Sequence, residues 1–267
     1  MIEVKNLTKK YGNKEVVKNV SLNIEKGKMI SLIGPNGAGK STVLSMIARL
    51  SDISEGEVII DGVPLKKWDN RELAKRISIL KQANDIDLKL TIRELVEFGR
   101  FPYTQGNLNE EDQKFINDAI EYMQLVDIQD KYLDELSGGQ RQRAYIAMVI
   151  AQNTEYIFLD EPLNNLDMKH CVQMMKVIRS LVDELGKTVV TVLHDINFAS
   201  CYSDTIIALK NGELYKEGTV EKIINKELLE DLYQTEFKIT EIANKRISTY
   251  FIKDVHFIKK INDNENQ

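Results

Sequence analysis

Short, almost continuously apolar runs alternate with longer amphipathic stretches along this chain. Three such runs lie at residues 29–34, 156–159 and 188–193. Short runs with few polar positions are typical of parallel strands that are covered on both faces. Five residues between the last two runs recur at helical spacing: Val172, Met175, Ile178, Val182 and Leu185. Gly186 follows them as a predicted C-cap, so the pattern predicts an α/β core.

Further strands are predicted at residues 56–62 and 76–82, and a helix at residues 40–50. Asn211-Gly212 separates two apolar runs, which predicts a hairpin. The alternation after about residue 240 predicts a second hairpin, and the chain is polar after about residue 263.

The segment from about residue 83 to 135 has a different pattern. Three acidic residues follow Asn109, and Ile116, Ile120 and Met123 then recur at helical spacing. We expect helices here and no strand. The α/β core is therefore expected to contain a helical insertion.

Composition limits the classes of function. The 267 residues carry 36 Lys and Arg against 41 Asp and Glu, a net charge of −5. This balance argues against a protein that coats nucleic acid, so no nucleic-acid partner is expected. The longest apolar run, residues 144–151, has eight residues, whereas a membrane span needs about 20. We expect no signal peptide, and Cys171 and Cys201 are expected to be small buried residues in a reducing compartment.

Residues 34–41, GPNGAGKS, match the phosphate-binding pattern G-x-x-x-x-G-K-[ST], with a predicted strand before them and a predicted helix after them. The glycines allow successive N–H groups to face one anion, and the helix N-terminus adds further donors. Lys40 is expected on the β- and γ-phosphates and the Ser41 hydroxyl on Mg²⁺. The alternative is an ordinary glycine-rich turn.

Two carboxylates, Asp160 and Glu161, follow the predicted strand at residues 156–159. Ligands of open α/β sheets bind at the carboxyl ends of strands, so Asp160 is expected to coordinate Mg²⁺. Glu161 is the expected general base for the water that attacks the γ-phosphate. Alone, the pair could equally be a solvated cap of the next segment.

Three more side chains are candidates on position alone. His194 ends the predicted strand at residues 188–193, where it could reach a γ-phosphate. Gln82, just after the apolar stretch at residues 76–80 and at the boundary with the helical segment, could bind Mg²⁺ or the attacking water. Tyr11 could stack on an adenine or be a turn aromatic. In isolation, His194 is more often structural and Gln82 an ordinary surface residue.

Residues 137–140, SGGQ, open a predicted helix. Ser137 and Gln140 fit a capping box, but a capping box does not require Gly138 and Gly139. Glycines at a helix N-terminus leave bare N–H groups that an anion can approach. One nucleotide cannot easily use both this helix and the phosphate loop of the same chain. Two chains arranged head to tail could do so across ATP.

The ordered set of motifs resembles the ATP-binding subunits of ABC transporters. This resemblance covers about residues 1–240, expected as a nucleotide-binding domain, with a helical subdomain at about 83–153 inserted into it and residues 241–267 as an extension. It implies a P-loop NTPase fold with a parallel sheet, a small antiparallel β subdomain and a helical subdomain. It also implies ATP and Mg²⁺ as ligands and Asp167 as the residue that couples two sites. The implied nucleotide-binding residues are Tyr11, Gly34, Pro35, Asn36, Gly37, Ala38, Gly39, Lys40, Ser41, Thr42, Ser137, Gly138, Gly139, Gln140 and Asp167. Asn164 and Lys81 stand where the family more often has Ser and Pro.

Within the family, residues 90–103, 158–170 and 193–204 look most similar to ATPases of ferric-siderophore importers, petrobactin-like or other catecholate systems. The resemblance implies a peripheral ATPase at the cytoplasmic face of the cell membrane. Its implied partners are a second copy, permease subunits and, indirectly, a substrate-binding protein. Haem or cobalamin is the alternative cargo. A soluble ABC ATPase without a transport role is a third hypothesis, and a nucleotide kinase would leave Ser137–Gln140 without a role.

Overall fold

Six strands form the central sheet, in the order β10–β9–β3–β8–β7–β6. The computed structural model describes residues 1–81, 89–104, 106–164 and 166–250. The strands are β3 (Met29–Ile33), β6 (Ile77–Leu80), β7 (Tyr156–Asp160), β8 (Thr188–Val192), β9 (Thr205–Lys210) and β10 (Glu213–Gly218). All neighbours are parallel except β9 and β10, which form the predicted antiparallel hairpin.

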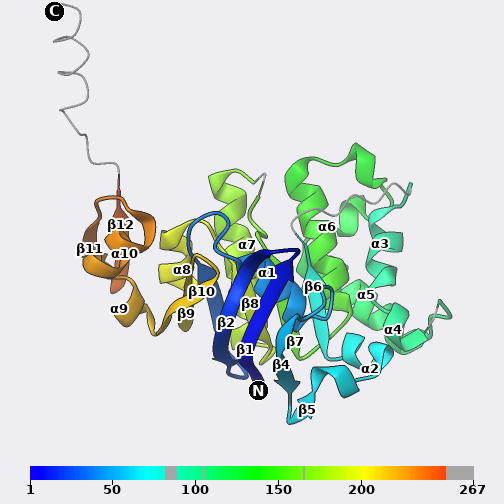
Figure 1. The fold of residues 1–267 in the computed structure, drawn as a ribbon. Coiled ribbons are helices and arrows are strands. Elements are labelled where there is room, and N and C mark those ends of the chain that lie inside the picture. The colour runs from blue at the N-terminus through cyan, green and yellow to red at the C-terminus, as the bar shows by residue number, and fades with distance from the viewer. Residues whose placement is uncertain (82–88, 105, 165, 251–267) are drawn as a thin grey trace, which may run out of the picture.

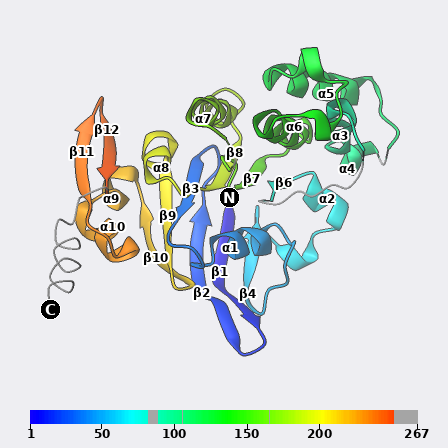
Figure 2. The ribbon, with the colours of Figure 1, turned by 90° about the horizontal axis from the view of Figure 1, so that it is seen from above.

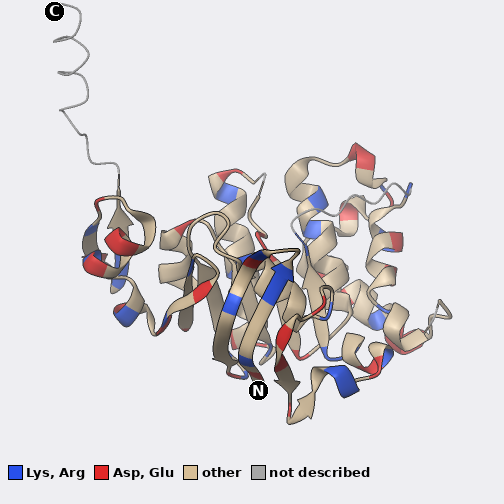
Figure 3. Ribbon diagram, viewed as in Figure 1, with Lys and Arg blue, Asp and Glu red and all other residues tan. Residues whose placement is uncertain are grey.

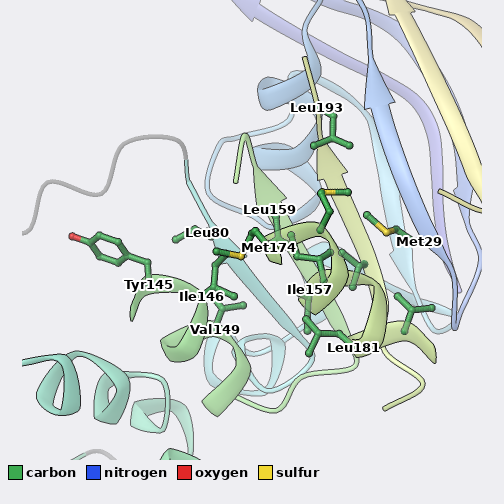
Figure 4. Close-up of a cluster of buried hydrophobic side chains, with 14 of the residues drawn as sticks. Met29, Leu80, Tyr145, Ile146, Val149, Ile157, Leu159, Met174, Leu181 and Leu193 are labelled. Carbon is green, nitrogen blue, oxygen red and sulfur yellow. The ribbon is translucent and has the colours of Figure 1, made fainter. Parts of the chain in front are cut away.

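Successive side chains of the central strands enter two different hydrophobic cores. Met29, Ile157 and Leu159 pack on the side of three helices, α6 (Gly138–Ala151), α7 (Met168–Asp183) and α8 (Ile196–Tyr202). Figure 4 shows this core around Ile157 and Leu159. Ile30 and Phe158 face the other way, toward α1 (Lys40–Ile47). The strands are buried on both faces, which explains their continuous apolar runs.

A second, four-stranded antiparallel sheet lies beyond α1, so that α1 is held between the two sheets (Figure 2). Its order is β2–β1–β4–β5, with bounds β1 (Ile2–Tyr11), β2 (Lys14–Ile24), β4 (Glu55–Ile60) and β5 (Val63–Pro64). A 3₁₀ turn η1 (Leu65–Lys67) and the short helix α2 (Asn70–Ala74) lead from this sheet to β6.

The inserted segment is helical, as predicted. It contains α3 (Ile92–Phe98), α4 (Phe101–Thr104), α5 (Glu110–Tyr122), η2 (Val126–Ile128) and η3 (Leu133–Glu135), which lie beside α6 (Figure 1). Its described part has no strand, and an isolated β-bridge joins Thr91 to Tyr132. Arg100 binds Asp112 at 2.9 Å and the carbonyl oxygen of Ala151 at 2.9 Å, which ties α5 and α6 to the α3–α4 corner.

The C-terminal part of the described chain contains α9 (Val220–Ile223), α10 (Lys226–Tyr233) and a hairpin of β11 (Lys238–Ile242) and β12 (Lys245–Thr249). The hairpin predicted after about residue 240 is therefore present and starts at residue 238. Its turn residues Ala243 and Asn244 have φ values of 49° and 59°. The division into a domain at 1–240 and an extension at 241–267 stays a prediction.

The predicted fold class is confirmed: a parallel α/β core, a small antiparallel sheet and a group of helices. Acidic and basic positions are interspersed over the ribbon in Figure 3 rather than separated into two halves. Among the described residues, no helix combines the length and the apolar character that crossing a bilayer requires.

Candidate functional site

The phosphate loop connects β3 to α1 and depends on glycine for its shape. Gly34 has a φ of 141°, and a Cβ atom there would lie 2.1 Å from the carbonyl oxygen of Leu209. Gly37 and Gly39 also have positive φ values, 77° and 95°. The backbone at these three positions favours glycine, and a side chain at position 34 would collide with β9.

Lys40, the first residue of α1, is buried and directed back over the loop. Its ammonium group donates to the carbonyl oxygens of Gly34 at 2.8 Å and Pro35 at 3.0 Å. Burial lowers the pKa of Lys40, and the charges of Glu161 and Asp160 oppose this shift. An ammonium held by two carbonyl oxygens in this position can exchange them for the oxygens of a phosphate.

Ser41 and Asp160 meet at the carboxyl end of β7. The Ser41 hydroxyl donates to a carboxylate oxygen of Asp160 at 2.8 Å. Burial raises the pKa of Asp160, and the bond from Ser41 opposes it. A hydroxyl and a carboxylate this close supply the hard oxygen ligands that Mg²⁺ prefers, so these two residues fit the metal.

Glu161 and His194 lie at the same edge of the sheet, as the parallel strands predicted. His194 Nε2 is 2.6 Å from a Glu161 carboxylate oxygen, and Asn164 donates to the other oxygen at 2.6 Å. Glu161 has a φ of 54°, a value that non-glycine residues rarely adopt. Strained backbone of this kind is common where a chain must aim a side chain at a site.

A cavity of about 860 Å³ lies above the loop and joins these groups. Its lining includes Asn36, Gly37, Ala38, Gly39, Lys40, Ser41, Thr42, Glu161 and His194. Gly34 and Pro35 are not among the lining residues. Residues 36–42 of the loop and helix start therefore share one cavity with Glu161 and His194. Asp160 is hydrogen-bonded to one of the lining residues, Ser41.

One wall of this cavity was not predicted. It consists of residues from β2 and the β9–β10 turn: Lys14, Glu15, Val16, Lys18 and Asn211. The backbone N–H of Lys18 donates to the carbonyl oxygen of Gly212 at 2.7 Å, which fixes β2 against that turn. Asn211 belongs to the predicted hairpin turn, but no local motif marks any of these residues as part of a nucleotide site.

Tyr11 does not line this cavity. It ends β1 with 58% of its surface exposed, and the ammonium of Lys9 lies 4.9 Å from its ring centroid. The proposed contact of Tyr11 with an adenine stays a prediction. Gln82, predicted to bind Mg²⁺ or water, lies outside the described residues.

The Ser137–Gln140 segment forms the expected capping box at the start of α6. Ser137 N–H donates to Gln140 Oε1 at 3.1 Å, and Gln140 N–H donates to Ser137 Oγ at 3.3 Å. A Cβ atom at Gly139 would make only ordinary contacts, the shortest 3.5 Å to Leu166 Cδ2. Neither Gly138 nor Gly139 has a positive φ. Thus crowding does not require glycine at position 139, and left-handed backbone requires it at neither position.

None of Ser137, Gly138, Gly139 and Gln140 lines the cavity above the phosphate loop. Asp167 caps the start of α7, where its carboxylate accepts from the His170 N–H at 2.9 Å. This bond lowers the pKa of Asp167. The structure therefore separates these predicted residues from the phosphate loop of the same chain. The described residues contain no group of three or more His, Cys, Asp or Glu that could hold a metal ion without further ligands.

Comparisons with known proteins place this geometry in context. The family model described as "ABC transporter" matches residues 17–164. The petrobactin import ATP-binding protein YclP of Bacillus subtilis (strain 168) is 61% identical over 251 residues, which cover 94% of this chain and 100% of the relative. The petrobactin import ATP-binding protein FatE of Bacillus anthracis is 47% identical over 250 residues, 94% and 100% of the two chains.

Among solved structures, the chain is similar to a dimeric post-hydrolysis state of the ATP-binding cassette MJ0796 bound to ADP and Pi. The TM-score is 0.74 at 37% sequence identity, and the match covers 82% of this chain and 99% of that one.

Proposed function

Because this chain belongs to the ABC transporter family, we propose that it is the ATP-hydrolysing subunit of an importer that takes up a ferric siderophore. The observation that supports a ferric siderophore as the cargo is the 61% identity to a petrobactin import ATP-binding protein along the whole length of that relative. A catecholate siderophore of the petrobactin kind is therefore the first candidate. Haem and cobalamin are the alternatives that the experiment below separates from it.

The arrangement of the cavity supports a role for each catalytic candidate. Lys40 and the loop N–H groups would bind the β- and γ-phosphates, and Ser41 and Asp160 would hold Mg²⁺. Bound Mg²⁺ would neutralise charge that develops on the phosphate oxygens. Glu161 is the proposed general base for the attacking water, and His194, 2.6 Å away, the side chain that reaches the γ-phosphate. Tyr11, whose ring is exposed, remains the proposed stacking partner of the adenine, and Val16 lines the cavity.

The position of Ser137–Gln140 supports a dimer of two copies. These residues do not line the chain's own nucleotide cavity, and a Cβ atom at Gly139 would make only ordinary contacts within the chain. In a head-to-tail pair, the N-terminus of α6 of one copy would face the γ-phosphate bound by its partner. Asp167, at the neighbouring N-terminus of α7, is the proposed link between the two sites.

The inserted helices support contact with a membrane permease. Phe98 and Phe101, at the corner between α3 and α4, expose 50% and 56% of their surface. Large exposed aromatic side chains are typical of interaction surfaces. We place this corner against the permease at the cytoplasmic face of the membrane, and a substrate-binding protein would then act only through that permease.

Uptake by cells tests this function. We expect cells whose sole copy carries Lys40→Ala to lose uptake of radio-iron supplied as one class of siderophore, while uptake of labelled cobalamin and haem is unchanged. Lys216→Ala, on the exposed strand β10, is the matched control and should leave uptake unaffected. Unchanged uptake of every ferric siderophore with loss of cobalamin or haem would assign the other cargo.

A further inference from the structure

The C-terminal part of the chain contacts the phosphate loop directly. The backbone N–H of Gly34 donates to the hydroxyl oxygen of Tyr233 at 3.1 Å, across 199 positions of sequence. Tyr233 ends α10, and its burial raises the pKa of the phenol to about 12, so it stays a neutral hydroxyl at physiological pH. A residue outside the motif set therefore binds the first glycine of the loop.

Both backbone polar groups of Gly34 are hydrogen-bonded. Its N–H is held by Tyr233, and its carbonyl oxygen accepts from the ammonium of Lys40 at 2.8 Å. The collision between a side chain here and the Leu209 carbonyl shows how closely β9 confines this residue. A change in the Tyr233 bond would consequently act on the residue that receives Lys40.

Tyr233 is itself held in place by aromatic packing. Its ring lies 5.9 Å from that of Phe237, centroid to centroid, and the Phe237 ring lies 5.5 Å from that of Tyr250. The Phe237 N–H donates to Glu230 at 3.0 Å, and the Lys210 ammonium binds Asp231 at 2.8 Å. The end of α10 is thereby fixed both to the segment that follows it and to the end of β9.

The β11–β12 hairpin is joined to the other side of the site. Ser248 donates to the Asn197 side chain from its N–H at 2.7 Å and from its hydroxyl at 2.9 Å. The Ser200 hydroxyl donates to the carbonyl oxygen of Arg246 at 2.5 Å. Asn197 and Ser200 belong to α8, which begins at Ile196, two residues after His194. The C-terminal part therefore touches both the phosphate loop and the helix behind His194.

We propose that Tyr233 is a positioning residue of the nucleotide site: its hydroxyl holds Gly34, and thereby the phosphate loop, in the shape that receives the phosphates of ATP. The segment from α10 to β12 supports the site by holding Tyr233. This inference rests on the proposed function, because it presumes that the cavity binds ATP.

Tyr233→Phe tests the hydrogen bond while keeping the ring. We expect the dissociation constant of a fluorescent ATP analogue to rise about fivefold, as expected when one hydrogen bond of ordinary strength is lost. The loop contacts the phosphates before and during the reaction, so KM should rise while kcat changes less than about twofold. Phe237→Leu, which removes the ring that packs on Tyr233, should raise the dissociation constant in the same direction by a smaller factor.

Tyr215→Phe is the matched control. The Tyr215 hydroxyl, on β10, is hydrogen-bonded to Asp231 of α10, the helix that also holds Tyr233, and it does not bond to the phosphate loop. It should leave ATP affinity unchanged. Equal affinity of Tyr233→Phe and wild type would overturn the positioning role, as would an equal loss of affinity in both tyrosine variants. A wild-type protein that binds no ATP would instead overturn the proposed function itself.

Discussion

At the scale of single residues, the free site holds two buried ionisable groups in unfavourable surroundings. Burial raises the pKa of Asp160 and lowers that of Lys40, so both shifts disfavour the charged forms that phosphate and Mg²⁺ binding would use. Perturbation of this kind is concentrated at functional sites. We attribute the shifted pKa values of Asp160 and Lys40 to a site that binds charged ligands, and we expect these two groups to lower the stability of the free protein.

Asp160→Asn should therefore stabilise the free protein. Folding raises the pKa of this carboxyl, so its contribution to the stability of the folded protein is greatest below the unfolded-state pKa of about 4. That contribution is lost as the pH rises through the pKa of the folded state. Asn can still accept the bond from Ser41 and carries no charge. We expect its unfolding temperature to exceed that of wild type by about 2–4 °C near pH 7, with no gain near pH 3, measured by calorimetry.

Asp183→Asn is the control of opposite sign, because Arg179 holds the pKa of Asp183 below its usual range. The Asp183 carboxylate stabilises the folded protein at pH values above the pKa of the unfolded state. This stabilisation is lost as the pH falls through the pKa of the folded state. The variant should thus be less stable than wild type near pH 7. Lower stability of Asp160→Asn near pH 7 would contradict the pKa argument.

The sequence predicts the site only where the chemistry is contained in a short motif. Lys40, Ser41, Glu161 and His194 were found because strand ends and the phosphate loop mark them, and the structure brings them together. Their roles remain predictions. The β2 wall of the cavity was missed. It depends on how β2 packs against the β9–β10 turn, which no local pattern encodes.

At the scale of elements, the N-terminus of α6 keeps two glycines in a turn that a better helix former could occupy. A Cβ atom at Gly139 would be accommodated with ordinary contacts. The hydrogen bonds of the capping box are made by Ser137 and Gln140 alone. We therefore attribute the two glycines to an anion that approaches the N–H groups of this helix from outside the chain.

Gly139→Asp separates helix stability from this anion site. An acidic residue in the first turn of a helix is favourable, and Asp is a better helix former than Gly. We expect the unfolding temperature to be unchanged or higher, while ATP-dependent association of two copies, measured by light scattering, is lost through charge repulsion. An equal loss of association and of thermal stability would instead indicate that the glycine serves the fold.

The prediction of elements succeeded where burial on both faces produces continuous apolar runs, as in β3, β7 and β8. It did not find β1 and β2 from their pattern. The β1–β2 register shifts between Val4 and Leu7, between Leu7 and Lys9, and between Lys9 and Lys10. Each shift breaks the alternation of apolar and polar positions by which a half-buried strand is recognised.

At the scale of the whole molecule, α6 connects the candidate dimer contact to the catalytic edge. The Gln142 side chain donates to the carbonyl oxygen of Pro162 at 3.0 Å, directly after Glu161. On the other side, α6 packs against α3 and α5 beside the exposed corner at Phe98 and Phe101. A rigid movement of these helices would therefore change the proposed permease contact at this corner and the proposed partner contact at the N-terminus of α6 together.

A mixture of two defective chains tests the head-to-tail arrangement. If each site combines the phosphate loop of one copy with α6 of the other, a pair of one Lys40→Ala chain and one Gly139→Asp chain has one intact site and one doubly defective site. Both chains would also carry Glu161→Gln, so that bound ATP is not consumed. With Mg²⁺-ATP, we expect unlike chains to associate in a fluorescence-transfer assay, although neither variant associates with itself. If each site belonged to a single chain, mixing would restore nothing, whereas Glu161→Gln chains without the other changes would still pair.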